Sequence, residues 1–258
     1  MPASLAESAS ETGDRLVALV TGGGKRVGRA IAMELARSGY DVCVHYHHSE
    51  VEATEVAEAV TALGQRGAVV GGDLADPESW SRIVSGTVSR LGGLDVLVNN
   101  ASEFTSSSQD SLSTFDPTLW DRLVRTNLVA PVGLCHHAAS WLRRSGRGCV
   151  VNLCDIAADR PWVGHLAYCA SKGGLVNLTK SLARSMAPDV RVNGVSPGIA
   201  IFPESYEASV RDRLIARVPL AREGTPEEVG ELVCFLVASA EYITGQVIAI
   251  DGGRSVRP

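Results

Sequence analysis

Residues 16–28 read LVALVTGGGKRVG, an apolar run that leads through a glycine-rich turn into the start of a helical pattern. The run from Leu16 to Val20 predicts a buried strand, and the helix is expected from about Gly28 to Ser38. Glycines in such a turn let the backbone approach a pyrophosphate closely, and the amides at the helix N-terminus supply donors to it. The stretch therefore predicts a dinucleotide-binding turn, with tight packing of strand against helix as the alternative.

The same alternation continues along the chain. Further strands are expected at 42–46, 68–71, 96–99, 150–153, 190–195 and 247–250, and further helices at 51–63, 80–91, 117–142, 167–186 and 226–238. The strands are nearly continuous apolar runs, as expected when helices cover both faces of a parallel sheet. The pattern predicts an α/β fold in which residues 15–258 form one Rossmann-type, doubly wound parallel sheet flanked by helices, preceded by a mobile tail over residues 1–14.

The composition restricts the classes of partner. Hydrophobic residues make up 45% of the chain and charged residues 21%, which is typical of a soluble globular protein. The net charge of −5 gives no basic surface for nucleic acid or an anionic membrane. No run reaches transmembrane length, and residues 1–14 lack the apolar centre of a signal peptide. With six cysteines and no C-x-x-C pair, the chain is predicted to be cytoplasmic, with reduced thiols.

Asp155, Tyr168 and Lys172 are the candidate catalytic residues. Tyr168 and Lys172 are four residues apart and so share one face of a helix. A lysine cation near a phenol lowers the phenol's pKa, which prepares the tyrosine for acid–base chemistry near neutral pH. Asp155 follows an apolar run and adds a carboxyl whose pKa burial can raise, so that it carries a proton or relays one through water. The alternatives are a loop-capping aspartate and an incidental tyrosine–lysine pair.

The end of the second predicted strand indicates which cofactor fits. A site for NAD favours an acidic residue there, to hold the ribose hydroxyls. This chain instead has Tyr46-His47-His48-Ser49, with Lys25 and Arg26 in the glycine-rich turn. Hydroxyl, imidazole and guanidinium groups suit a 2′-phosphate, so NADPH is the predicted cofactor. A plain polar loop is the alternative, and a metal site is disfavoured because adjacent histidines on a strand point in opposite directions.

Polar segments follow three further strands. Asp73-Leu74 places a carboxylate where it could bind an adenine amino group or cap the next helix. The run from Asn99 to Ser102 follows the fourth strand, and Pro197-Gly198 follows the sixth. Because ligands bind at the carboxyl ends of the strands in open α/β sheets, these segments are expected to converge on one crevice.

In combination, these motifs resemble the short-chain dehydrogenase/reductase family from Arg15 onward. The resemblance rests on Thr21-Gly22…Gly28, Asn99-Asn100-Ala101, Asn127, Tyr168-x-x-x-Lys172, Pro197-Gly198 and Asp251-Gly252-Gly253. Within that family the chain is most similar to the pteridine reductases, including the bacterial dihydromonapterin reductases. The narrower resemblance rests on Lys25-Arg26, His45-Tyr46-His47-x-Ser49, Asn99-Asn100-Ala101-Ser102-x-Phe104 and Asp155, where most members of the larger family have serine.

The resemblance implies NADPH-dependent reduction of a pterin or dihydropterin, of the dihydrobiopterin, dihydromonapterin or dihydrofolate type, by hydride transfer to a ring C=N bond. It implies catalytic roles for Asp155, Tyr168, Lys172 and Asn127, the last anchoring a proton-relay water. The implied substrate-binding residues are Arg26, Ser102, Phe104, Asp155 and Tyr168, with Phe104 stacked on the pterin. The implied cofactor-binding residues are Gly22, Lys25, Arg26, Val27, Tyr46, His47, His48, Ser49, Asp73, Leu74, Asn99, Ala101, Ser102, Tyr168, Lys172, Pro197, Gly198 and Ile199.

The resemblance also implies a homotetramer in which Arg254 or Arg257 lies near a neighbour's active site. A substrate lid is expected over about 199–217, where Phe202, Glu204 and Tyr206 are candidate contacts.

Besides pterin reduction, two other functions stay open from the sequence. A carbonyl reductase, such as one acting on a 3-oxoacyl thioester, is disfavoured by Asp155, because a carbonyl gains nothing evident from an extra anion. A non-catalytic NADP(H)-binding module is disfavoured by the Tyr168–Lys172 pair. Phe104 and Asn127 each have a structural alternative to their site role. Phe104 is then a core aromatic residue, and Asn127 bridges backbone groups of a helix.

Overall fold

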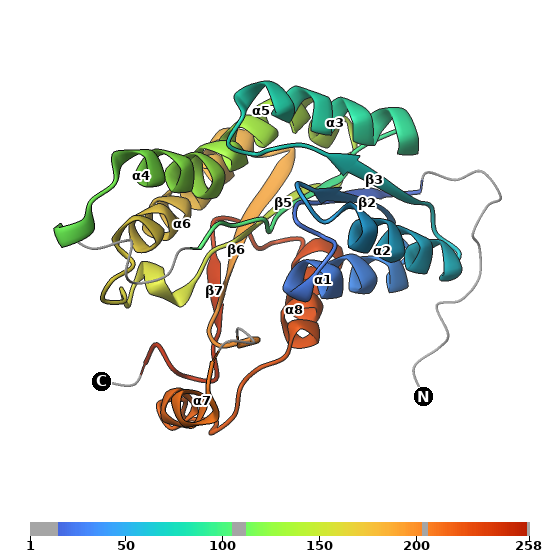
Figure 1. Ribbon diagram of the computed structural model, residues 1–258. Coiled ribbons are helices and arrows are strands. Elements are labelled where there is room, and N and C mark those ends of the chain that lie inside the picture. The colour runs from blue at the N-terminus through green and yellow to red at the C-terminus, as the bar shows by residue number, and fades with distance from the viewer. Residues whose placement is uncertain (1–14, 105–111, 203–205, 257–258) are drawn as a thin grey trace, which may run out of the picture.

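Seven parallel strands form one sheet in the computed structural model, which describes residues 15–104, 112–202 and 206–256 (Figure 1). The strands are β1 (Val17–Val20), β2 (Asp41–Tyr46), β3 (Gly67–Gly71), β4 (Val96–Asn99), β5 (Gly148–Leu153), β6 (Val190–Pro197) and β7 (Val247–Ile250). Their order across the sheet is β3-β2-β1-β4-β5-β6-β7. The predicted Rossmann-type doubly wound sheet is therefore confirmed, with the reversal of strand order between β1 and β4.

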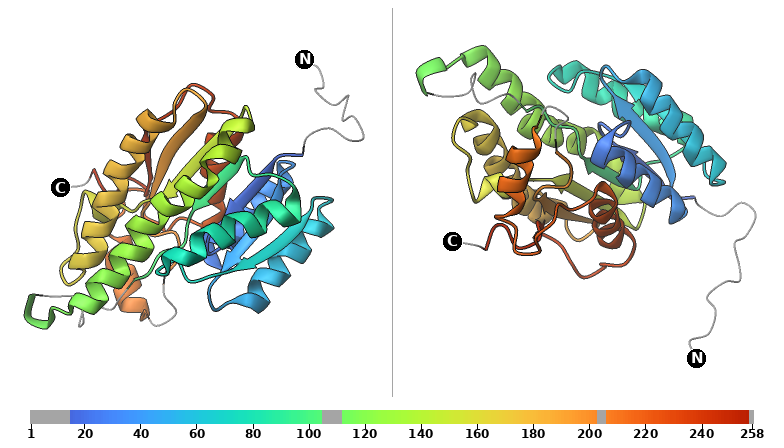
Figure 2. Two further views of the ribbon diagram at one scale, coloured as in Figure 1. Left: turned by 90° about the horizontal axis from the view of Figure 1, so that it is seen from above. Right: turned by 60° about the horizontal axis from the view of Figure 1, so that its bottom comes forward.

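Helices cover both faces of the sheet (Figures 1 and 2). One layer contains α1 (Arg26–Arg37), α2 (Glu50–Ala62) and α8 (Pro226–Ala238), and the other contains α3 (Pro77–Leu91), α5 (Ala130–Arg144) and α6 (Leu166–Met186). Two shorter helices, α4 (Pro117–Val124) and α7 (Ala208–Ile215), lie toward one end of the molecule. Within the described residues, no helix is long and apolar enough to cross a membrane.

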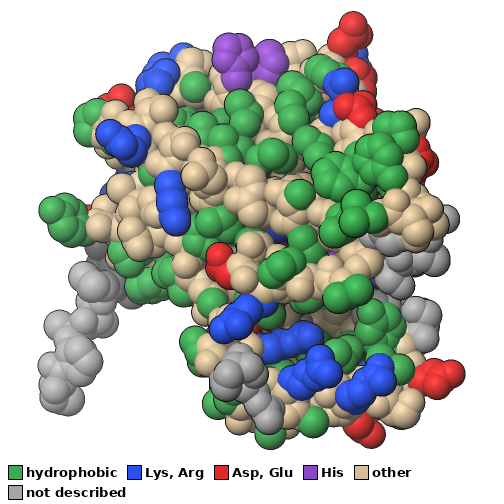
Figure 3. Space-filling view, turned by 90° about the vertical axis from the view of Figure 1, so that its left-hand side faces the viewer, with side chains coloured by type: hydrophobic (Ala, Val, Ile, Leu, Met, Phe, Trp, Pro, Cys, Tyr) green, Lys and Arg blue, Asp and Glu red, His purple; other side chains and the backbone are tan. Residues whose placement is uncertain are grey.

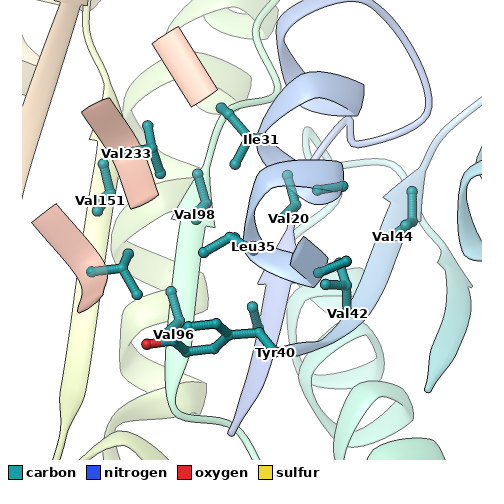
Figure 4. Packing of buried hydrophobic residues seen from close by; sticks show 14 of the residues in the cluster. Val20, Ile31, Leu35, Tyr40, Val42, Val44, Val96, Val98, Val151 and Val233 are labelled. Carbon is teal, nitrogen blue, oxygen red and sulfur yellow. The ribbon is translucent and has the colours of Figure 1, made fainter. Parts of the chain in front are cut away.

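The core on the α1 side is built from β-branched strand residues and the apolar stripe of α1 (Figure 4). Val20, Val44 and Val98 lie on neighbouring strands and pack against Ile31 and Leu35 of the helix, and each of the five side chains is 0% exposed. Burial of a side chain of this size stabilises the folded state by about 1.5–3 kcal/mol. This packing fixes α1 against the sheet, so the start of the helix stands at the carboxyl end of β1.

The continuous helix predicted over 117–142 is wrong. The structure divides it into α4, a π-helical segment (Arg125–Val129) and α5. Pro131 explains the break, because it has no N–H to donate to the carbonyl of Asn127 four residues earlier. Helix α7 was not predicted and lies inside the expected lid region.

Candidate active site

The side chains of Asp155 and Tyr168 are hydrogen-bonded to each other. Tyr168 lies in the first turn of α6 and is 7% exposed, and its hydroxyl donates to Oδ2 of Asp155 at 2.7 Å. Asp155 follows β5, and its Oδ1 accepts from the backbone N–H of Ala157 at 2.8 Å, which caps the 3-10 turn Ile156–Ala158. Asp155 is therefore both a capping residue and a partner of the phenol, because each function uses a different oxygen.

Burial is the largest influence on the pKa values of Asp155 and Tyr168. It raises the pKa of Asp155, although the hydrogen bonds and the cations Lys172 and Arg254 act in the opposite direction. Burial and the neighbouring Asp155 carboxylate raise the pKa of Tyr168 well above its ordinary value. The expected lowering of the tyrosine pKa by Lys172 is therefore wrong for this structure. The phenol is a neutral donor, and the carboxyl beside it keeps its proton to a higher pH than an exposed aspartate does.

Lys172 lies one turn after Tyr168, as the spacing predicted, and is 3% exposed. Its Nζ donates to the carbonyl of Leu153 at 2.8 Å and lies 5.7 Å from the centroid of the Tyr168 ring. Burial lowers the pKa of Lys172, while Asp155 raises it. The contact with Leu153 fixes the ammonium at the end of β5, next to the carboxyl–phenol pair.

An aromatic wall made of Phe104, Trp162 and His165 borders Tyr168. The Phe104 ring stacks on His165 with centroids 4.8 Å apart and meets the Tyr168 ring edge-on at 5.0 Å. Trp162 stacks on Tyr168 at 6.0 Å. Phe104 is 48% exposed, so it is not a core aromatic, and part of its surface is open to a ligand. Trp162 and His165 were not singled out in the sequence, where they stand in an unpatterned loop before α6.

Asn127 is buried in the π-helical segment, and protein groups satisfy its whole side chain. Its Oδ1 accepts from Ser102 Oγ and from the backbone N–H of Glu103, and its Nδ2 donates to the carbonyl of Glu103 and to Ser171 Oγ. These four bonds use the full capacity of the amide. The side chain therefore cannot also anchor a relay water, but it fixes the loop after β4 against α6.

A cavity of about 290 Å³ lies at the carboxyl ends of β1, β2 and β4. The structure places around it many of the residues predicted to bind the cofactor, namely Gly22, Lys25, Tyr46, His47, His48, Ser49, Asp73, Leu74, Ala101 and Ser102. No described side chain caps α1, so the first amides of that helix are unoccupied donors beside the glycine turn. Gly22 has φ of 61°, and a Cβ there would lie 3.1 Å from the Ala101 backbone. An uncapped helix N-terminus, the close backbone approach and a cavity lined by these segments fit a dinucleotide.

Comparison with known proteins identifies the family. A family model described as enoyl-(acyl carrier protein) reductase matches residues 24–255. The chain belongs to the short-chain dehydrogenase/reductase family.

Relatives within this family differ in their reactions. The chain is 33% identical over 240 residues to the 3-oxoacyl-(acyl-carrier-protein) reductase FabG of Staphylococcus aureus, covering 92% of this chain and 96% of the relative. It is 34% identical over 279 residues to pteridine reductase 1 of Leishmania tarentolae, covering 93% and 96%. The structure of FolM alternative dihydrofolate reductase 1 from Brucella canis, complexed with NADP, matches with a TM-score of 0.84 and 33% identity, covering 93% and 94% of the chains.

Several residues predicted for the cofactor site of this short-chain dehydrogenase/reductase point elsewhere. Asn99 is 4% exposed, and its Nδ2 donates to Asn152 Oδ1 at 2.8 Å in the core. Val27 lies in the first turn of α1 and packs against the core. Gly198 packs against Asp251, and Ile199 lines a second, smaller cavity of about 90 Å³. None of these residues is among those that line the larger cavity.

The cations of the glycine turn already have partners. Lys25 Nζ lies 2.6 Å from Glu52 Oε1 on α2, and the Arg26 guanidinium donates to the carbonyl of Ile201 at 3.1 Å. Arg26 has φ of 51°, in the left-handed region that costs a non-glycine residue about 1–3 kcal/mol. This backbone conformation directs Arg26 from the turn toward the segment after β6, where the lid was expected.

Asp73 belongs to an ion-pair network that the sequence did not reveal. Arg122 on α4 contacts Asp73 Oδ2 at 3.2 Å and Glu103 Oε1 at 2.6 Å. Asp73 Oδ1 accepts from Ala75 N–H, while Asp76 caps α3, so the predicted capping role of Asp73 is wrong. The network spans the cavity wall and joins the segments after β3 and β4.

The first histidine of the 45–48 stretch, which lies within β2, is structural. His45 is 1% exposed, accepts from Gly22 N–H at 3.2 Å, and bonds the carbonyl of Gly72 at 3.0 Å. Burial lowers the pKa of His45 to about 4, so the ring is neutral. Thr21 and Asn100 add further bonds that hold the glycine turn against the end of β4. His47 and His48 are exposed and stand at the cavity mouth.

The C-terminal segment lies next to the candidate site of its own chain. The charge of Arg254 acts on Asp155, and that of Asp155 on Arg254. The expected approach of Arg254 or Arg257 to a neighbour's site stays a prediction, since a single chain is described. Arg257 and Glu204, the other candidates from the sequence, lie outside the described residues.

Proposed function

We propose that this short-chain dehydrogenase/reductase reduces a pterin or dihydropterin to the tetrahydro form with NADPH. The observation that supports the proposal best is the 2.7 Å hydrogen bond between Tyr168 and a partly buried carboxyl whose pKa is raised. Reduction of a ring C=N bond needs a proton at nitrogen, and a carboxyl whose pKa is raised is better suited to supply it than an ordinary aspartate. The similarity to pteridine reductase 1 and to FolM adds support.

NADPH would bind in the cavity between the glycine turn and the His47–Ser49 segment, and when bound it supplies the hydride. The uncapped amides of α1 would hold its pyrophosphate, and His47, His48 and Ser49 would surround the 2′-phosphate. Lys25 would reach that phosphate after leaving Glu52. Lys172, fixed by Leu153, would hold the nicotinamide ribose.

The residues around Tyr168 would position the substrate and move the proton. Phe104 would stack on the flat pterin, and Ser102, held by Asn127, would bond its edge. Tyr168 would donate its proton to the ring nitrogen while Asp155 passes its own proton to the phenol oxygen. Because the phenol is neutral at the outset, this transfer leaves the negative charge on Asp155, close to Lys172 and Arg254.

Reduction of a 3-oxoacyl thioester is the second candidate, and the similarity to the Staphylococcus aureus FabG supports it. Asp155 argues against it, since a carbonyl oxygen can take its proton from the phenol and gains nothing evident from an additional carboxyl. A non-catalytic cofactor-binding module has no use for the bonded Asp155–Tyr168 pair. A homotetramer in the cytoplasm, with residues 199–217 as the substrate lid, completes the proposal.

The test is NADPH oxidation with dihydrobiopterin, dihydrofolate or an acetoacetyl thioester as substrate. Wild-type protein is expected to turn over the pterins. Asp155→Ser should lower kcat for them by roughly 100-fold, because general acid catalysis contributes at least that much. The Kd for NADPH, measured by fluorescence titration, should stay within twofold.

Asp159→Asn provides the matched control, since Asp159 is exposed and follows the same 3-10 turn. Turnover of the thioester alone would refute the pterin proposal. Pterin turnover that Asp155→Ser leaves unchanged would refute the proton-transfer role of Asp155.

A further inference from the structure

Arg122 on α4 pairs with two carboxylates at once. Lys and Arg side chains gather at several places on the surface, among them a group low on the face shown in Figure 3. Arg122 differs from a basic group that faces only solvent, because its Nη1 lies 3.2 Å from Asp73 Oδ2 and its Nη2 lies 2.6 Å from Glu103 Oε1. Both carboxylates belong to residues that line the larger cavity. The planar guanidinium therefore fixes two segments of the cavity wall relative to each other.

The two carboxylates that Arg122 joins are themselves held in place. The backbone N–H of Glu103 donates to Asn127 Oδ1 at 2.8 Å, and the carbonyl of Glu103 accepts from Asn127 Nδ2 at 3.0 Å. Asp73 Oδ1 accepts from the backbone N–H of Ala75 at 2.9 Å, while Oδ2 accepts from Arg122. Glu103 thus anchors Arg122, and Arg122 together with Ala75 fixes the direction of the Asp73 carboxylate.

Asp73 is an ionised acceptor at neutral pH. Burial acts to raise its pKa, but the hydrogen bonds from Ala75 and Arg122 and the charge of His47 outweigh burial and lower the pKa below the ordinary value of 3.8. An ionised carboxylate accepts hydrogen bonds and cannot donate one. Asp73 therefore favours a ligand edge that carries N–H groups and opposes one that presents a carbonyl oxygen.

The position of Asp73 in the cavity indicates which part of the cofactor meets it. Asp73 Oδ2 lies 3.8 Å from His47 Nε2, and His47 belongs to the segment proposed to surround the 2′-phosphate. The phosphate and the adenine are attached to the same ribose, so the base must lie close to that segment. Adenine carries an exocyclic amino group, which is a donor that an ionised carboxylate can accept from.

A polar group without a partner lies on the same wall of the cavity. Thr126 follows Arg122 by four residues, lines the cavity and is 6% exposed. Its Oγ1 is buried and has no hydrogen-bonding partner among the described residues. A buried hydroxyl without a partner costs free energy, and the polar edge of a base at this wall would supply one.

We propose that Arg122 is a positioning residue that makes the cofactor site selective for the adenine base. Held by Glu103, Arg122 orients the Asp73 carboxylate so that its Oδ2 accepts from the exocyclic amino group. Arg122 is not itself among the residues that line the cavity, so it acts through Asp73. This role rests on the binding of NADP(H) in the cavity, which is part of the proposed function, and does not depend on the reduction of a pterin.

The experiment measures the Kd values of two cofactors by fluorescence titration without substrate. One is NADPH, and the other is its hypoxanthine analogue, in which a carbonyl oxygen replaces the adenine amino group. Wild-type protein is expected to bind NADPH about tenfold more tightly, because the analogue loses a charge-assisted hydrogen bond and sets two acceptors against each other. Arg122→Gln should raise the Kd for NADPH about fivefold and that for the analogue less than about twofold. Arg122→Lys, which keeps the charge but not the planar fork, should recover part of the preference.

Asp73→Asn tests the carboxylate directly. The amide keeps an acceptor for Ala75 and adds an N–H group that can donate to the carbonyl of hypoxanthine. The preference for NADPH is therefore expected to fall below about twofold in this variant. A preference that Asp73→Asn leaves at the wild-type level would show that Asp73 does not contact the base.

Arg125→Gln is the matched control, because it removes the same charge three residues further along the chain from an exposed ion pair with Asp121. It should leave the preference for NADPH as in wild type. Equal changes of both Kd values in Arg122→Gln would reveal a general effect of charge or structure and overturn the proposal. A wild-type protein that binds the two cofactors equally well would overturn it too. Turnover of dihydrobiopterin judges the proposed reaction separately.

Discussion

Asp155 combines two roles that sequence patterns cannot distinguish. One oxygen closes a 3-10 turn and the other accepts from a phenol, so the same residue fits both the structural and the chemical interpretation. The turn fixes the carboxyl in place, which is what proton transfer at a defined distance requires. The structural role therefore supports the chemical one.

The raised pKa of Asp155 predicts how stability depends on pH. Because the folded protein holds this proton more tightly than the unfolded chain, the free energy of unfolding falls as pH rises from the ordinary value of 3.8 through the raised folded value. Asp155→Asn keeps the capping oxygen and removes the titration. Its Tm should exceed that of wild type by a few degrees at pH 8, since about 1 kcal/mol shifts Tm by roughly 2–4 °C in a chain of this size. At pH 4 the difference should shrink.

Thermal unfolding at both pH values measures the effect. Asp159→Asn is again the control, and it should leave the pH dependence as in wild type. A difference between Asp155→Asn and wild type that grows toward pH 4 would contradict the raised pKa.

Residue spacing predicted the position of Lys172 but not its electrostatic effect. The four-residue interval fixed which helix face the two side chains share. The sign of the phenol's pKa shift depends on burial and on Asp155, which comes from another segment. Likewise, the three histidines at 45, 47 and 48 look alike in sequence. His45 is buried within β2, whereas His47 and His48 follow the strand and are exposed. Tertiary environment, which spacing does not encode, decides these roles.

At the scale of elements, the glycine turn contacts α2 through an ion pair. Lys25 Nζ lies 2.6 Å from Glu52 Oε1. If Lys25 binds the 2′-phosphate as proposed, Glu52 competes with that phosphate for the same ammonium group.

Glu52→Gln is expected to lower the Kd for NADPH about threefold, because it frees Lys25 and removes a negative charge, while exposed ion pairs are individually weak. The Kd for NADH should not change. Fluorescence titration of both cofactors measures this, with Glu55→Gln on the exposed side of the same helix as the control. An equal improvement for NADH would show that Lys25 is not selective for the phosphate.

The division of the long predicted helix shows a limit of periodicity. The apolar pattern of residues 117–142 is helical throughout, and Pro131 was the available signal for a break. A proline near the start of α5 predicts a disturbed turn but not a π-helical one. The network of Arg122, Asp73 and Glu103 likewise could not be found from sequence, because three separate segments contribute to it.

At the scale of the whole molecule, strand order decides where the chemistry lies. The sequence predicted the strands and their parallel arrangement because buried runs alternate with helices, and all loops after the strands then meet at one edge. The reversal between β1 and β4 opens the cavity there. The inward turn of Asn99 depends on packing across this edge, which no local pattern contains.

A cofactor that bridges several strand ends should stabilise the molecule as a whole. NADP⁺ at about 100 times its Kd adds about 2.7 kcal/mol to the free energy of unfolding, which corresponds to a rise in Tm of roughly 5–10 °C. NAD⁺ at the same concentration should give a smaller rise. Differential scanning fluorimetry with both cofactors measures it, and equal shifts would contradict the preference for NADP(H).

The four bonds of Asn127 have a mechanical consequence. Ser171 Oγ, which accepts from Asn127, itself donates to the carbonyl of Tyr168 at 2.7 Å. A continuous series of hydrogen bonds through the Asn127 side chain thus joins the loop proposed to bind the pterin edge to the helix turn that carries Tyr168. Any displacement of one is transmitted to the other, so ring and acid keep their alignment while the surrounding loops move.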